Sequence, residues 1–181
     1  MDFAAFPLPG AAPLLFIQPD SQKRLYELRS GDALLAQLDC TRPAFATAVS
    51  RSHHWVFTRT GFLRPQVAVR ALGLPSPSAT FISGWFSGQV SLPLRSYSFI
   101  PTPWWGRQWE WRQGRQCLIR YAPHKNTMEC TLTLPPSDLP FGDLPLLALL
   151  GCHLLVLYAE DAAVASLALS FLPSPSSPYW L

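Results

Sequence analysis

The chain has 181 residues, of which 49% are hydrophobic and only 14% are charged. That charged share lies well below the roughly 25% typical of soluble domains, so it fits a chain with much interior and also one in partial contact with a membrane. The length predicts one domain with a sizeable core, and the four single cysteines lack the spacing of a zinc site or a small disulfide framework.

The formal net charge of +3 conceals a strong segregation along the sequence. Residues 42–125 contain eleven basic residues and one acid, Glu110, and therefore carry a net charge of +10. Residues 1–41 carry −2 and residues 126–181 carry −5. Such asymmetry bears on partners and on the electrostatic field rather than on the fold.

Residues 1–20 are apolar but are broken by Pro7, Pro9 and Pro13. They begin with an acid and lack the basic and continuous apolar regions of a signal peptide. This composition predicts a loose N-terminal arm and a cytoplasmic protein whose cysteines are reduced and buried.

From Lys23 onward the sequence consists of short runs in which apolar and polar residues alternate, separated by turn signals every eight to twelve residues. This pattern predicts short antiparallel strands joined by tight connections. The eleven candidate strands cover residues 23–29, 33–39, 45–50, 53–59, 66–72, 79–86, 89–93, 95–100, 108–112, 116–121 and 127–134.

Residues 144–158 carry no formal charge and are apolar on all sides, apart from Gly151 and His153. A helix of this kind lies in a protein core or a membrane. Its fifteen residues, about 22 Å in length, are fewer than the ~20 residues that a membrane span needs. Asp143 fits the N-cap, and Glu160 and Asp161 close the run. A single transmembrane helix over 144–158 is therefore disfavoured against a core helix.

Closure into a barrel removes the edges that so long a sheet would expose. A barrel of eleven or twelve strands is too wide for its own side chains to fill, and the apolar helix matches the strands in length. We therefore predict a mainly β fold: a closed antiparallel barrel of about 12 strands over residues 21–165 around a central helix, followed by a tail over 166–181.

This layout resembles the tubby C-terminal-like fold, which tubby proteins share with phospholipid scramblases and LURP-one-related proteins. The resemblance covers residues 22–162 and rests on the strand rhythm, the stretch Gly-Phe-Leu-Arg-Pro at 61–65, the Trp-rich segment at 104–112 and the helix. It implies association with membrane lipids, and for tubby domains with phosphoinositide headgroups. It carries over no catalytic residue.

Arginine suits bidentate contacts with phosphate, so the basic residues are candidates for binding an anionic lipid. The alternative is that they are ordinary outward-facing strand residues. Trp104 and Trp105 are candidate membrane anchors in a predicted loop, although tryptophans here also fit packing in the barrel wall or stacking on single-stranded nucleic acid. The candidate anion-binding residues are Arg51, Arg59, Arg64, Arg70, Arg107, Arg112, Arg115, Arg120 and Lys125.

The sequence has no recognised nucleophile, phosphate-binding or metalloprotease motif, and no plausible pair of carboxylates. We therefore expect no enzyme activity, no cofactor and no metal. The leading hypothesis is a monomeric, cytoplasmic module, peripheral at the membrane, that binds anionic phospholipid or phosphoinositide headgroups. An interaction or structural domain with an unknown protein partner is the alternative, and nucleic-acid binding is a weaker one.

Overall fold

A computed structural model describes residues 2–42, 44–61, 65–84, 87–102, 108–125, 127–136 and 141–170. For Phe141 and residues 167–170 it describes the backbone alone.

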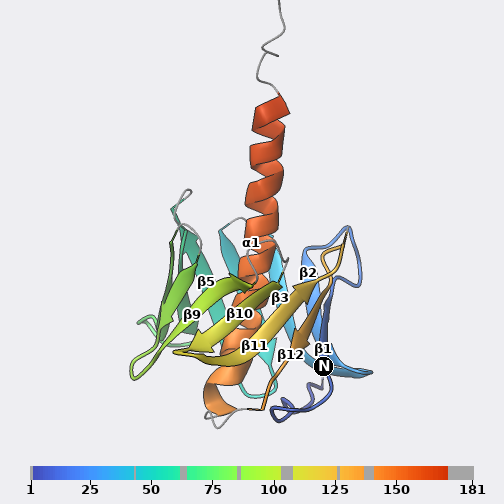
Figure 1. Ribbon diagram of the computed structural model, residues 1–181, viewed down its shortest axis with the longest axis vertical. Helices are drawn as coiled ribbons and strands as arrows, with labels where there is room; N and C mark the ends of the chain where they lie inside the picture. Colours follow the sequence, from blue (N-terminus) through green and yellow to red (C-terminus); the bar gives the residue numbers. More distant parts are fainter. Residues whose placement is uncertain are drawn as a thin grey trace, which may run out of the picture.

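Within these ranges, twelve antiparallel strands close into a barrel, and one long helix runs through it (Figure 1). Around the barrel the order is β1-β12-β11-β10-β9-β8-β7-β6-β5-β4-β3-β2, so each strand pairs with its neighbours in sequence and β1 closes the ring against β12. The mainly β, closed-barrel prediction is confirmed. The strands are β1 (Leu14–Ile17), β2 (Leu25–Ser30), β3 (Ala33–Arg42), β4 (Phe45–Ser50), β5 (His54–Thr60), β6 (Gln66–Ala71), β7 (Ala79–Ser83), β8 (Gly88–Ser91), β9 (Ser96–Thr102), β10 (Gln108–Gln113), β11 (Gln116–Pro123) and β12 (Cys130–Thr133).

Side-chain alternation in the strands produces the barrel interior. Cys130 and Leu132 of β12 are buried while Thr131 and Thr133 are not, as the period of two requires. Trp55 and Phe57 of β5 face inward in the same way. The inward faces are therefore apolar and meet the helix on every side.

Strand β1 was not predicted. Leu14–Ile17 falls within the segment expected to be a loose arm, yet Leu14 pairs with Leu132 and Leu15 with Arg29. Leu14 and Phe16 are both about 1% exposed. Four residues after a proline-broken stretch give a weak sequence signal. Pairing with β2 and β12 on either side holds them in a strand.

Helix α1 (Leu144–Ser170) follows a short 3₁₀ helix, η1 (Phe141–Asp143). Within the barrel, Trp111 Nε1 donates to the Leu147 carbonyl at 2.8 Å, and Tyr121 Oη donates to the same carbonyl at 2.9 Å. Gly151 makes room for these two rings, because a Cβ there would lie 2.3 Å from Tyr121 Oη. The glycine thus sets the depth and rotation of the helix.

The helix is longer than predicted. It continues through Glu160 and Asp161, the two acids expected to end it, and through the segment Ala162–Ser170 that includes the start of the expected tail. Alanine-rich sequence favours helix, and both acids find partners on the barrel wall. We call the end of the barrel where α1 emerges the mouth, and the end where it begins the base (Figure 1).

Candidate functional site

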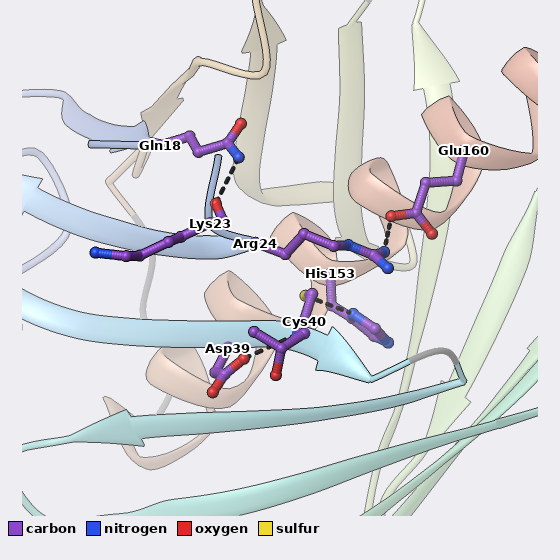
Figure 2. Close-up of polar contacts among 8 residues, drawn as sticks. Gln18, Lys23, Arg24, Asp39, Cys40, His153 and Glu160 are labelled. Carbon is purple, nitrogen blue, oxygen red and sulfur yellow. Dashed lines mark hydrogen bonds and ion pairs between the residues drawn. The ribbon is translucent and has the colours of Figure 1, made fainter. Parts of the chain in front are cut away.

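Two ion pairs hold α1 at the mouth. Arg59, near the end of β5, donates from Nη2 to Asp161 Oδ2 at 2.6 Å, and its side chain is only 11% exposed. Arg24, just before β2, pairs with Glu160 (Figure 2). Arg24 lies two residues before the inward-facing Tyr26, and Arg59 lies two residues after the inward-facing Phe57. Because strand side chains alternate, both arginines point into the mouth rather than outward. We call the four ion-paired residues the collar.

Below the collar lies a buried polar contact between β3 and α1. Cys40 Sγ is 3.7 Å from His153 Nδ1 (Figure 2). The His153 ring packs against Phe57. Burial, together with the charges of Arg59 and Arg24, lowers the pKa of His153 to about 3, so the imidazole is neutral. His153 Nε2 is buried and has no hydrogen-bond partner among the described residues.

The buried thiols are not suited to nucleophilic chemistry. Burial raises the pKa of Cys40 to about 12 and that of Cys130 to about 12, because a thiolate is poorly solvated there. The pKa of Cys152 is raised in the same way. Thiols of this kind behave as small apolar side chains.

Three of the candidate anion-binding arginines already have carboxylate partners. Arg59 belongs to the collar, and Arg112 and Arg120 both donate to Glu110, at 2.7 and 2.8 Å. Glu110 is 2% exposed although it faces outward between two inward tryptophans. Burial alone would raise its pKa, but the hydrogen bonds from Arg120 and Arg112 outweigh that effect and lower the pKa.

The other described candidates lie on different strands and turns. Arg51 is exposed in the β4–β5 turn, where it lines a small hollow with Pro145 and therefore sits at the base. Arg70 is exposed on β6 and Arg115 in the β10–β11 turn. Lys125 is exposed in the β11–β12 loop at the mouth. Arg64, Arg107, Trp104 and Trp105 lie outside the described residues.

Beyond the collar, α1 leaves the barrel and carries apolar residues into solvent (Figure 1). Residues 162–166 are all exposed, and Val164 is 52% exposed. Contiguous apolar surface of this kind marks an interaction site in soluble proteins. We call residues 162–170 the projecting end of α1.

A cavity of about 480 Å³ opens beside the helix at the mouth. Its walls include Phe16 of β1, Trp109 of β10 and Met128 before β12, and its helix side includes Leu155, Tyr158 and Ala162. The Trp109 ring stacks on Tyr158 with centroids 5.1 Å apart, which fixes one edge of the opening. Packing of tryptophans in the barrel wall was one of the alternatives left open by the sequence, which gives no indication of this cavity.

Within the described ranges, one helix is long and apolar enough to cross a membrane. It covers Leu144–Ser166, and more than half of its most apolar stretch is buried in the barrel. Core helices of soluble proteins share these properties, so this composition is weak support for a span. Over the same ranges, no three histidine, cysteine or acidic side chains are grouped to hold a metal ion.

Comparison of the chain with protein-family models, with curated proteins and with solved structures finds no match. The resemblance to tubby-like proteins accordingly stays a prediction made from the layout of the sequence.

Proposed function

We propose that the protein is a non-enzymatic module that binds a lipid bilayer with its mouth facing the membrane and the projecting end of α1 in one leaflet. The observation that carries this proposal is the apolar helical surface, Val164 included, that α1 exposes beyond the collar. Transfer of apolar surface out of water is favourable by roughly 25 cal/mol per Å², and a bilayer offers that transfer without a specific partner.

The length of the projecting end favours insertion over spanning. Residues 162–170 rise by about 13 Å at 1.5 Å per residue, less than half of the roughly 30 Å hydrocarbon core. The collar charges would then lie at the level of the headgroups. Apolar surface buried in one leaflet beneath a ring of charged residues anchors a protein to the membrane without crossing it.

Spanning by α1 would require the helix to leave the barrel. That movement would break the bonds from Trp111 and Tyr121 to the Leu147 carbonyl, and it would expose the inward faces of the strands to water. It would also place Glu160 and Asp161 in hydrocarbon without Arg24 and Arg59, at about 2.5–3.5 kcal/mol for an acid near a helix centre.

Attraction to anionic lipid depends on basic residues that are free to meet it. Arg59, Arg112 and Arg120 are paired with carboxylates, whereas Lys125 is exposed at the mouth. Arg42 is exposed as well, at the β3–β4 turn, where Ala44 accepts a hydrogen bond from the backbone of the collar residue Arg59. We therefore assign the electrostatic part of binding to Lys125 and Arg42 at the mouth rather than to a converged arginine surface. A single basic residue near an anionic membrane contributes about 1 kcal/mol.

Vesicle flotation tests the apolar part of the proposal. Wild-type protein is expected to float with vesicles, and Val164→Glu is expected to abolish flotation because it places a charge in the leaflet. Leu74→Glu is the matched control, since Leu74 is 58% exposed in the β6–β7 loop at the base. Equal flotation of all three proteins, or none by the wild type, would refute the proposal.

A second pair of variants tests the orientation. With vesicles that contain phosphatidylserine, Lys125→Glu at the mouth is expected to weaken binding about fivefold or more, and Arg51→Glu at the base to leave it unchanged. The same variants should not differ on neutral vesicles. A larger loss from Arg51→Glu would mean that the base faces the membrane.

A further inference from the structure

The cavity beside α1 has the size and lining of a small-ligand site. Its volume of about 480 Å³ falls within the roughly 300–1,000 Å³ of such sites, and aromatic and aliphatic side chains form most of its wall. Leu155 and Ala162 mark the extent of its helix side, which covers about 11 Å along the axis. The cavity is therefore an elongated apolar slot.

The slot is continuous with the surface proposed to meet the bilayer. Ala162 lines the cavity and is also the first residue of the projecting end. At about 100° per residue, Leu155, Ala159 and Ala162 share one face of α1, and Val164 points the opposite way. A chain that lies along the first face can pass from the leaflet into the slot without crossing water.

One acidic side chain sets the polarity of the opening. Among the described residues that line the cavity, Glu129 alone carries a formal charge. Its side chain is 44% exposed, and its Oε2 lies 3.4 Å from Nδ1 of the His124 ring. A carboxylate among the lining residues opposes an anionic head and favours an ammonium group.

We propose that this cavity binds the hydrocarbon chain of an amphiphile whose ammonium head lies beside Glu129. The inference rests on the proposed function, because the mouth must face the bilayer for membrane lipids to reach the opening. The shared chemistry is an alkyl chain with an ammonium group, whether it belongs to a membrane lipid or to a free alkylamine.

Isothermal titration with soluble probes of equal chain length tests the site without a membrane. Dodecylammonium and dodecanoate below their micelle concentrations, and dodecanol below its solubility limit, are expected to bind with affinity that falls in the order dodecylammonium, dodecanol, dodecanoate. Glu129→Gln should weaken dodecylammonium about threefold and leave dodecanol unchanged, as expected for a partly exposed ion pair. Absence of saturable binding, or a preference for dodecanoate, would overturn the inference.

Two tryptophan substitutions on opposite faces of α1 distinguish binding in the cavity from binding elsewhere on the helix. Ala159 is exposed and lines the cavity, so Ala159→Trp is expected to abolish binding of dodecanol without unfolding the barrel. Val164→Trp, on the opposite face, is the matched control and should bind dodecanol as the wild type does. Equal affinity in the two variants would overturn the inference.

Flotation of the same proteins distinguishes the two proposals. If Ala159→Trp loses the probe but still floats with vesicles, both proposals stand. If the wild type floats but binds no probe, the cavity inference fails and the membrane proposal survives. If the wild type binds the probe but does not float, the cavity exists and the membrane proposal fails.

A comparison of vesicles with and without phosphatidylethanolamine shows whether a membrane lipid supplies the ammonium group. Stronger flotation on vesicles that contain phosphatidylethanolamine, lost in Ala159→Trp, supports a lipid source. Equal flotation on the two kinds of vesicle assigns the site to a free alkylamine.

Discussion

Arg59 and Asp161 meet at 2.6 Å across the mouth of the barrel although 102 residues separate them in the sequence. The contact joins β5 to the point where α1 leaves the barrel. It converts an arginine that sequence analysis assigned to an anionic ligand into part of the collar. Asp161, expected to end the helix, instead fixes the helix in place.

Removal of Arg59 should therefore destabilise the fold. Arg59→Ala leaves Asp161 partly buried without its partner, and we expect a loss of about 1–2 kcal/mol in the free energy of unfolding, between the values for exposed and buried pairs. Urea unfolding measures this loss, and Arg70→Ala, at an exposed position on the outer wall, is the control that should lose less. A double-mutant cycle with Asp161→Asn isolates the pair; a coupling energy near zero would contradict the collar.

Gly151 offers a test in which packing opposes helix propensity. Alanine normally stabilises a helix interior by up to about 1 kcal/mol over glycine. Here its Cβ would meet Tyr121 and Trp111 at 2.3–2.8 Å, so Gly151→Ala should destabilise by about 1–3 kcal/mol or more. Gly142→Ala, where a Cβ meets nothing within 4 Å, is the control. Stabilisation by Gly151→Ala would show that α1 does not lie against these rings.

His153 should make stability depend on pH. Its pKa is about 3 in the folded protein against 6.5 for an ordinary histidine, so below pH 6.5 the unfolded chain binds a proton that the folded chain does not. Stability is thus complete above that pH and declines as pH falls toward 3, by about 2 kcal/mol between pH 7 and pH 5.

His153→Leu should remove that part of the pH dependence, as followed by urea unfolding at both pH values. His53→Gln, at an exposed position, should keep it. The difference between the two variants is decisive because both keep every acid of the wild type. Identical slopes for wild type and His153→Leu would mean that the imidazole is protonated or exposed in the folded protein.

The barrel core should not tolerate a charge on α1. Leu149 is fully buried in the part of α1 that lies inside the barrel, and Leu149→Asp would bury a carboxylate without a partner. We expect no soluble folded protein from it, as judged by gel filtration and circular dichroism. Leu94→Asp, at a residue that is 94% exposed in the β8–β9 turn, should fold normally. Folded Leu149→Asp protein would contradict the helix-filled barrel.

The sequence predicts those features that depend on local periodicity. Alternation such as Cys130–Thr133 identifies the strands, and the all-round apolar character of α1 identifies the core helix. Contacts set by register were not predictable in this way. Whether Arg59 or Glu110 meets a partner depends on which residues the barrel places opposite it. The extension of α1 depends on the ion pairs that Arg24 and Arg59 form with Glu160 and Asp161.

The candidate site was predicted less well than the fold. Arg120 is a basic strand residue that the sequence cannot distinguish from a free one, because Glu110 reaches it only after the β10–β11 pairing forms. Arg112 lies two residues from Glu110 on the same strand. The cavity at the mouth combines residues from β1, β10, β12 and α1, so no single stretch of sequence reports it. The roles of Trp104 and Trp105 stay predictions.

Carbonate extraction of membranes tests most directly whether α1 fills the barrel while only its end enters a leaflet. The full chain, bound to membranes at neutral pH, is expected to appear in the supernatant after alkaline carbonate, because residues 162–170 are too short to span. Val164→Glu should be in the supernatant before carbonate as well. Retention of the wild type in the pellet after carbonate, with release by detergent alone, would show that α1 spans the membrane and does not fill the barrel.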